Sequence, residues 1–238
     1  MGTQMTEEAI KRTRRKTNYK NADKKETIEL LPRSENQALY IKAIQERDQV
    51  FVLGPAGTGK TYIAATQAAN MYIRKEIDKI VITRPNVAAG KSIGYFPGTL
   101  EEKMMPWVMP VLEVLHWQLG KGAVDTGIKN GNIEIAPFET MRGRSFRDAF
   151  VILDEAQNVT PHEIKMFLTR IGENCKVILN GDIFQSDLSE TSGLAKAIHM
   201  VKKYMLPVPV IEFGVDDIVR SNLCKLWIMA FMQEEAKK

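Results

Sequence analysis

A glycine-rich segment between an apolar run and a helical pattern most constrains how this chain can fold. Residues 54–61 read Gly-Pro-Ala-Gly-Thr-Gly-Lys-Thr, which satisfies the pattern G-x-x-x-x-G-K-[ST]. The run before it, residues 50–53 (VFVL), is typical of a strand buried on both faces of a parallel sheet. In this context the segment predicts a phosphate-binding loop, because backbone N–H groups and the start of the next helix converge on one anion.

The residue types within this loop suit a nucleoside triphosphate with Mg²⁺. Gly57 and Gly59 leave room for the phosphates, Lys60 supplies a positive charge to the β and γ phosphates, and Thr61 offers a hydroxyl to the metal. The predicted nucleotide-binding residues are Gly54, Pro55, Ala56, Gly57, Thr58, Gly59, Lys60 and Thr61.

Two more buried strands are predicted to end in polar residues that complete the site. After residues 149–153 (AFVIL), Asp154 is expected to hold Mg²⁺ and Glu155 to orient and deprotonate an attacking water. After residues 177–179, Asp182 is expected to hold a turn and Gln185 to sense the γ-phosphate. Taken alone, the Gly181-Asp182 pair could equally be a simple turn.

Apolar runs that alternate with helical patterns predict a doubly wound, mainly parallel α/β sheet. A capping box at Ser34 and Gln37 predicts a helix over residues 35–46. Residues 86–131 fit less well and are interpreted as an insertion on the rim of the sheet, with an amphipathic segment over 100–119 and a glycine-bearing turn over 120–131. The predicted strands are residues 50–53, 79–83, 132–135, 150–153, 176–179 and 208–211.

Composition excludes several classes of protein. No apolar run in the 238 residues approaches the roughly 20 that a membrane-spanning helix needs. The two cysteines and three histidines lack the spacing of a disulfide scaffold or a zinc site. No secretory signal is visible at the N-terminus, so we expect a cytoplasmic protein with no membrane partner.

The positive charge of the chain is concentrated at its N-terminus. Residues 1–25 carry eight basic and three acidic side chains, whereas the whole chain has a net charge of +4, which leaves the rest at −1. We expect residues 1–30 to form a mobile basic arm and residues 31–238 to form one folded ATPase domain. Such an arm is suited to nucleic-acid backbones, although it could equally be a solvated leader.

Several of these motifs together resemble a known family. Asn36-Gln37, the phosphate-binding loop, Asp154-Glu155 and the 181–185 turn follow the order of the first RecA-like domain of superfamily 1 helicases. Within that group the chain is most similar to the PhoH-like family of phosphate-starvation P-loop ATPases. The stretches that carry this likeness are residues 83–87 (TRPNV), 94–98 (GYFPG), 101–103 (EEK), 142–146 (RGRSF), 153–158 (LDEAQN) and 217–220 (DIVR).

The resemblance implies roles for further residues. Gln37 would contact the adenine edge, in addition to the roles of Lys60, Thr61, Asp154, Glu155 and Gln185 given above. Arg84 is a candidate for the nucleic-acid backbone, with an ion pair inside the protein as an equal alternative. Arg142 and Arg144 suit backbone binding or an intersubunit contact, or else a solvated face.

A single P-loop domain lacks the arginine that a second RecA-like domain gives a helicase. We therefore expect a homo-oligomer, such as a hexameric ring, in which Arg220 of a neighbouring subunit serves as an arginine finger; pairing with Asp216 or Asp217 is the alternative. The resulting hypothesis is a Mg²⁺-dependent, helicase-like ATPase coupled to RNA or single-stranded DNA. The alternatives are a slow nucleotide switch or scaffold for protein partners, and a small-molecule phosphotransferase, which the presence of Glu155 disfavours.

Overall fold

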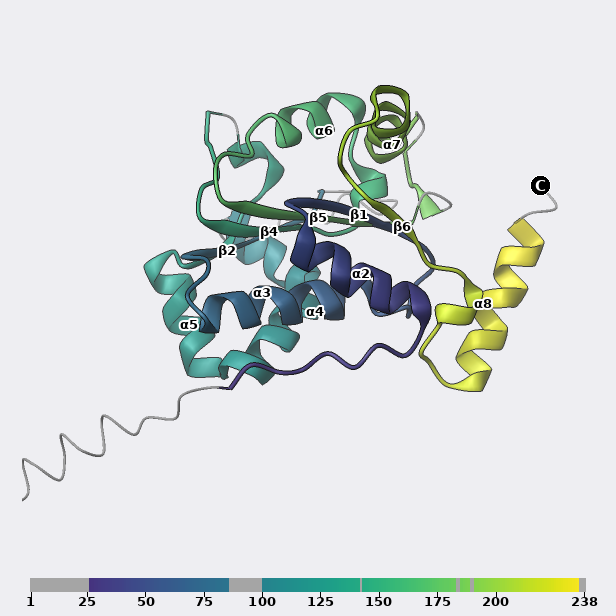
Figure 1. The fold of residues 1–238 in the computed structure, drawn as a ribbon, viewed down its shortest axis with the longest axis horizontal. Coiled ribbons are helices and arrows are strands. Elements are labelled where there is room, and N and C mark those ends of the chain that lie inside the picture. Colours follow the sequence, from purple (N-terminus) through teal and green to yellow (C-terminus); the bar gives the residue numbers. More distant parts are fainter. Residues whose placement is uncertain (1–25, 86–99, 142, 183–184, 189–190, 236–238) are drawn as a thin grey trace, which may run out of the picture.

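A six-stranded parallel sheet forms the centre of the computed structural model (Figure 1), which describes residues 26–85, 100–141, 143–182, 185–188 and 191–235. The strand order is β3-β2-β4-β5-β1-β6, and each neighbouring pair is parallel. The predicted doubly wound sheet is confirmed, with strand ends that shift by at most two residues. The strands are β1 (Gln49–Leu53), β2 (Lys79–Thr83), β3 (Ile133–Ile135), β4 (Ala149–Leu153), β5 (Cys175–Gly181) and β6 (Val210–Glu212).

Helices cover both faces of the sheet and enclose two apolar cores. Helices α2 to α5 lie on one face, whereas α6 and α7 lie on the other (Figure 1). Helix α8 lies at one side, apart from both layers. Within the described ranges, no helix is both long and apolar enough to span a bilayer. The helices are α2 (Glu35–Glu46), α3 (Lys60–Ile73), α4 (Leu100–Leu119), α5 (Lys121–Asn130), α6 (Pro161–Leu168), α7 (Gly193–Tyr204) and α8 (Asn222–Glu235).

The order of the strands determines where the polar strand ends meet. β5 lies between β1, which leads into the glycine-rich loop, and β4, which precedes Asp154. Because all these strands are parallel, their carboxyl ends open on the same edge of the sheet. This arrangement is that of a RecA-like P-loop domain.

Helix α2 begins at the predicted cap, but the partner of Gln37 differs from the expected one. The Ser34 hydroxyl accepts a hydrogen bond from the Gln37 backbone N–H at 3.2 Å. The side chain of Gln37 reaches past Ser34 and accepts from the backbone N–H of Arg33 at 2.9 Å. The full reciprocal capping box forms instead at the start of α6, between Thr160 and Glu163.

The interpretation of residues 86–131 as a rim insertion needs correction. Residues 86–99 lie outside the described residues, but α4 buries a stripe of apolar side chains in the core on the α2–α5 face. The predicted turn over 120–131 is the helix α5, with Gly120 and Gly131 at its two caps. Gly127 inside it packs so closely against Ile133 that a Cβ would lie 2.9 Å from the Ile133 side chain.

The boundary of the predicted arm also needs correction. Residues 1–25 lie outside the described residues, but residues 26–30 are attached to the folded domain. The side-chain amide of Asn70, on α3, exchanges two hydrogen bonds of 2.8 and 2.9 Å with the backbone of Ile28, and Leu30 packs against the core. Residues 26–30 therefore belong to the domain.

We expect the close packing of the start of α7 against Val159 and Thr160, just before α6, to be sensitive to one methyl group. A Cβ on Gly193 would lie 2.4 Å from the carbonyl oxygen of Thr160, which is backbone and cannot rotate away. Gly193→Ala should therefore lower the free energy of unfolding by about 1–3 kcal/mol, measured by urea denaturation. Gly122→Ala is the matched control, since nothing lies within 4 Å of its Cβ, and it should leave stability unchanged or raise it by about 0.5–1 kcal/mol.

Candidate nucleotide site

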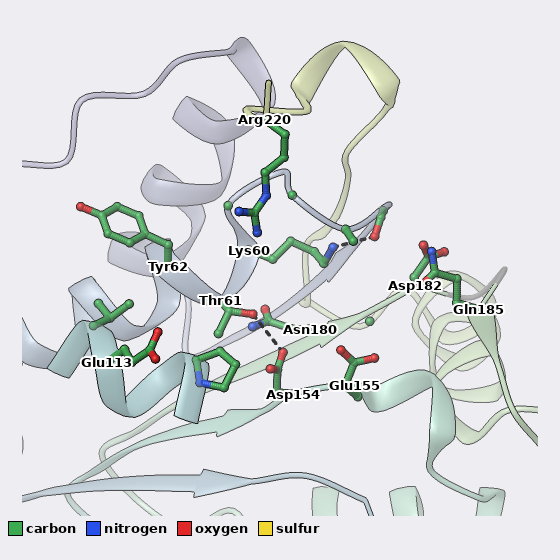
Figure 2. Close-up of a pocket in the computed structure, with 17 residues that line it drawn as sticks. Lys60, Thr61, Tyr62, Glu113, Asp154, Glu155, Asn180, Asp182, Gln185 and Arg220 are labelled. Atoms are coloured by element: carbon green, nitrogen blue, oxygen red, sulfur yellow. Dashed lines mark hydrogen bonds between the residues drawn. The ribbon is translucent and has the colours of Figure 1, made fainter. Parts of the chain in front are cut away.

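A cavity of about 350 Å³ opens at the carboxyl ends of β1, β4 and β5 (Figure 2). It brings together most of the predicted site residues, from segments far apart in the sequence. It also includes three residues of α4 and the ring of Tyr62, which were not predicted. The residues that line it are Gly54, Ala56, Gly57, Gly59, Lys60, Thr61, Tyr62, Pro110, Glu113, Val114, Asp154, Glu155, Asn180, Gly181, Asp182, Gln185 and Arg220.

The glycine-rich loop has the backbone shape that the sequence pattern requires. Gly57 and Gly59 have φ angles of +83° and +90°, which other residues rarely adopt. The buried Thr58 side chain donates to the carbonyl of Pro55 at 3.1 Å and so closes the loop on itself. Helix α3 starts at Lys60, so its N-terminus, with unpaired N–H groups, points at the cavity.

Lys60 is folded back onto the loop. Its Nζ donates to the carbonyl oxygens of Gly54 at 2.6 Å and Pro55 at 2.8 Å. Burial lowers the pKa of Lys60, while the nearby carboxylates of Asp182, Asp154 and Glu155 act in the opposite direction. A triphosphate would add negative charge beside this half-buried ammonium group and raise its pKa again.

Asp154 and Thr61 meet across the cavity, although 93 positions separate them in sequence. The Thr61 hydroxyl donates to Asp154 Oδ1 at 3.2 Å (Figure 2). Burial raises the pKa of Asp154, and the charge of Glu155 adds to this rise; Arg84, Thr61 and Asn180 oppose it. A cation beside this carboxylate would lower its pKa again.

The donor set at this point suits Mg²⁺. Thr61 and Asp154 offer only oxygen ligands, and Mg²⁺ is usually held by one or two protein oxygens, water and substrate phosphates. Among the described residues, no group of three or more His, Cys, Asp or Glu side chains could hold a metal by itself. The residues therefore fit a metal that is bound together with a nucleotide.

Glu155 is held in an unusual conformation. Its φ of +53° is left-handed, which is a cost for a residue with a side chain and is often found at functional sites. Gln157 donates to its Oε2 at 2.6 Å, and the Arg84 guanidinium lies 3.8 Å from its Oε1. Arg84 also donates to the Trp107 carbonyl at 3.1 Å and lies over the Trp107 ring. For Arg84, the structure thus shows the ion pair within the protein that the sequence left open.

Gln157 connects Glu155 to the turn after β5. Its Oε1 accepts a hydrogen bond from the backbone N–H of Asp182 at 3.0 Å. The side chain of Gln157 therefore links the polar residues after β4 to those after β5. The N–H of Gln185 bonds the Asp182 carbonyl at 3.0 Å, and both residues line the cavity. Residues 183 and 184 lie outside the described part of this turn.

Arg220 lies at the cavity of its own chain, whereas the sequence assigned it to a neighbouring subunit. The backbone N–H of Val219 bonds the Gly57 carbonyl at 2.9 Å and fixes this segment over the loop. Figure 2 shows the guanidinium pointing into the cavity above Lys60. The alternative pairing partners are engaged elsewhere: Asp217 accepts from Asn36 at 2.9 Å, and Asp216 lies 3.7 Å from Lys225.

Gln37 does not line the cavity. Besides the bond to Arg33, its Nε2 donates to the Thr58 carbonyl at 2.9 Å, so both ends of the amide are used within the chain. In this structure Gln37 braces the phosphate-binding loop, and an adenine contact would require one of these bonds to break.

The arginine pair upstream of β4 gives no support for a nucleic-acid surface. Arg142 lies outside the described residues. Arg144 forms a two-pronged ion pair with Glu134 of β3, in which Nη2 donates to Oε2 at 2.8 Å, and Lys79 lies 3.2 Å from the same carboxylate. These pairs fasten the segment to the sheet edge.

Sequence reasoning missed two buried residues next to the cavity, Asn180 and Tyr40. Tyr40 is fully buried on α2, and its hydroxyl lies 3.2 Å from Asn180 Oδ1. Burial, together with the charge of Asp154, raises the pKa of Tyr40 well above its usual value, so the phenol stays protonated. Asn180 had a sequence signal, since it is the first polar residue after a buried run, whereas Tyr40 had none beyond its apolar helix position.

Comparison with solved structures finds a helicase among the matches. The Pif1 helicase from Candida albicans matches with a TM-score of 0.39 and 16% sequence identity, over 79% of this chain and 41% of that chain.

Curated relatives are much more similar in sequence. Protein PhoH of Escherichia coli (strain K12) is 45% identical over 213 residues, which cover 88% of this chain and 60% of that protein. The PhoH-like protein of Bacillus subtilis (strain 168) is 46% identical over 197 residues, which cover 82% of this chain and 61% of the relative. The chain thus spans about three fifths of the length of these relatives. The family described as PhoH-like protein matches residues 29–232, a range that includes the loop, both strand ends and Arg220. The chain belongs to this family.

Proposed function

We propose that this protein is a Mg²⁺-dependent ATPase whose turnover is coupled to RNA or single-stranded DNA. The observation that carries the proposal is the meeting of Lys60 and Thr61 with Asp154 and Glu155 around one cavity. Phosphate binding alone needs only the loop, whereas hydrolysis also needs a carboxylate that can take a proton from water.

The proposed roles follow the chemistry of each side chain. Lys60 and the loop N–H groups bind the phosphates. Thr61 and Asp154 would hold Mg²⁺, which when bound neutralises phosphate charge. Glu155 takes a proton from a water that attacks the γ-phosphorus; a P–O bond to water forms, the bond to the β–γ bridging oxygen breaks, and ADP and phosphate leave. Gln185 and Arg220 are suited to oxygens of the terminal phosphate.

Coupling to nucleic acid has a candidate route through Arg84. Its guanidinium touches both Glu155 and α4, so any ligand that moves Arg84 would also change the surroundings of Glu155. A guanidinium binds phosphate oxygens well, which makes a nucleic-acid backbone a suitable ligand. The slow switch or scaffold remains the second candidate, and the tethering of Glu155 by Gln157 and Arg84 favours it.

Self-association is proposed on the basis of α8. Among its apolar side chains, Leu223, Leu226, Trp227 and Phe231 are each between 59% and 67% exposed. Such a helix is expected to be covered by another surface, and we propose a second copy of the chain. Since α8 begins two residues after Arg220, a neighbour bound there would touch the edge of the nucleotide cavity.

The proposed roles of Lys60 and Glu155 predict different losses. Lys60→Ala should abolish turnover and weaken nucleotide binding, because the phosphates lose their cation. Glu155→Gln should keep nucleotide affinity but lower kcat by roughly 10²–10⁴-fold, because the amide cannot accept the proton. Isothermal titration and a phosphate-release assay, each with and without RNA, would measure both. Lys42→Ala, on the exposed face of α2, is the control, and equal binding loss in both site variants would contradict the assignment.

Changes at Arg84 should alter the response to RNA. Arg84→Ala removes the cation beside Glu155, so the ratio of RNA-stimulated to basal kcat should fall towards one, and Arg84→Lys should restore part of it. Arg74→Ala is the matched control, because Arg74 is exposed and pairs with Glu76 at the far end of α3. A stimulation ratio that Arg84→Ala leaves unchanged would argue for coupling by another route.

The position of Arg220 predicts how mixed variants behave. Arg220 and Lys60 line the cavity of the same chain, so a mixture of Arg220→Ala and Lys60→Ala subunits should show no more activity than the two variants added together. Solution mass by light scattering should be measured on the same mixtures, with Lys42→Ala, on the exposed face of α2, as a surface control. Recovery of activity in a mixed oligomer would show instead that Arg220 acts on a neighbouring subunit.

A further inference from the structure

Asn180 occupies a central place in the cavity. It stands near the end of β5, where it pairs in register with Val52 of β1, and Leu179 before it pairs with Leu153 of β4. The residue therefore stands on the strand between the one that leads into the phosphate-binding loop and the one that leads to Asp154. Figure 2 shows it next to Thr61 and Asp154, and it is fully buried.

The two ends of the Asn180 amide are in different situations. Its Oδ1 accepts a hydrogen bond from the Tyr40 hydroxyl at 3.2 Å. Its Nδ2 is buried and has no acceptor in hydrogen-bonding geometry among the described residues, although it lies on the side of the Asp154 carboxylate, whose pKa Asn180 helps to lower. A buried donor without a partner is uncommon in a folded protein and destabilises it unless a ligand or water accepts the bond.

The orientation of this amide is determined by its neighbours. With the amide reversed, Oδ1 would be on the side of the Asp154 carboxylate, and two acceptors would repel each other. In the observed orientation, Tyr40 donates to the oxygen, and the nitrogen is turned towards Asp154 at the cavity wall. Asn180 thus presents a fixed donor at the place where the proposed γ-phosphate, Lys60 and Asp154 would come together.

We propose that Asn180 is a further catalytic residue, whose Nδ2 donates a hydrogen bond to an oxygen of the terminal phosphate of a bound nucleoside triphosphate, and that Tyr40 is the positioning residue that orients its amide. This inference rests on the proposed function, since it requires a nucleotide in the cavity. A fixed donor of this kind favours a phosphate that carries developing charge, because it needs no reorganisation when the reaction occurs.

The same contacts make α2 responsive to the terminal phosphate. Tyr40 lies three residues after Gln37, so both side chains extend from one side of α2. Gln37 bonds the carbonyl of Thr58 in the loop, and Tyr40 bonds Asn180. Loss of the terminal phosphate would free Nδ2 again, and α2 is the helix to which that change is transmitted.

Discrimination between tri- and diphosphate tests the role of Asn180. Asn180→Leu keeps the side-chain size but removes the donor, so affinity for a non-hydrolysable ATP analogue should fall about tenfold while ADP affinity changes less than about twofold. Tyr40→Phe should lower kcat with KM unchanged and leave ADP binding unaltered. Asn180→Ser, a shorter donor, should give an intermediate ratio and serves if the leucine variant fails to fold. Calorimetry with each nucleotide and Mg²⁺ gives the ratios, and steady-state kinetics gives kcat and KM.

Gln118→Leu is the matched control. It removes another buried amide, which donates to Thr66 at 2.7 Å between α3 and α4, so it should lower thermal stability without changing the ratio of the two affinities. Equal losses for both nucleotides in the Asn180 variants, or an unchanged ratio, would overturn the inference. Failure of the proposed function looks different, because the unaltered protein would then bind neither nucleotide, and both proposals would fall together.

Discussion

The parallel pairing of β1, β5 and β4 is the constraint on which the rest of this structure depends. It brings Thr61 and Asp154, 93 positions apart in sequence, to a hydrogen bond of 3.2 Å. Since side chains alternate along a strand, a one-residue slip in either pairing would turn the strand-end residues to the opposite face. The buried aliphatic strands hold this register, because every residue of β4 is buried. The packing that buries these strands therefore also sets the positions of Thr61 and Asp154 in the site.

Strong local signals made most of this architecture predictable. The strands were recognisable because a strand buried on both faces needs an unbroken apolar run, and the glycine-rich loop because its φ angles need glycine. Local signals also misled the prediction of helix α5, because the glycines at residues 120, 122, 127 and 131 indicated a turn. Two of them are caps, and Gly127 is required by the approach of Ile133, so here tertiary packing outweighed local propensity.

The residues whose roles were harder to predict are those whose partners are distant in sequence. Nothing in the sequence around Gln37 indicates that its amide is used up by Arg33 and Thr58, 21 residues on. The position of Arg220 depends on how the chain returns after β6, where Val219 bonds the Gly57 carbonyl. Arg84 was ambiguous because one guanidinium suits a carboxylate and a phosphate equally well. Composition and spacing describe what each side chain can bind, whereas the chain path decides which partner it meets.

The restraint on Glu155 bears on how such a site would work. A general base must reach its water, yet Glu155 is engaged by Gln157 on one oxygen and faces Arg84 from the other, on a left-handed backbone. Gln157 also bonds the backbone of Asp182, and Arg84 the backbone of α4, so the carboxylate cannot turn without disturbing one of these two segments. Whatever ligand moves the turn after β5 or the helix α4 therefore acts on Glu155 as well. A site built in this way would have its glycine-rich loop already shaped for phosphate, whereas the carboxylate of Glu155 is tied to the turn after β5 and to α4.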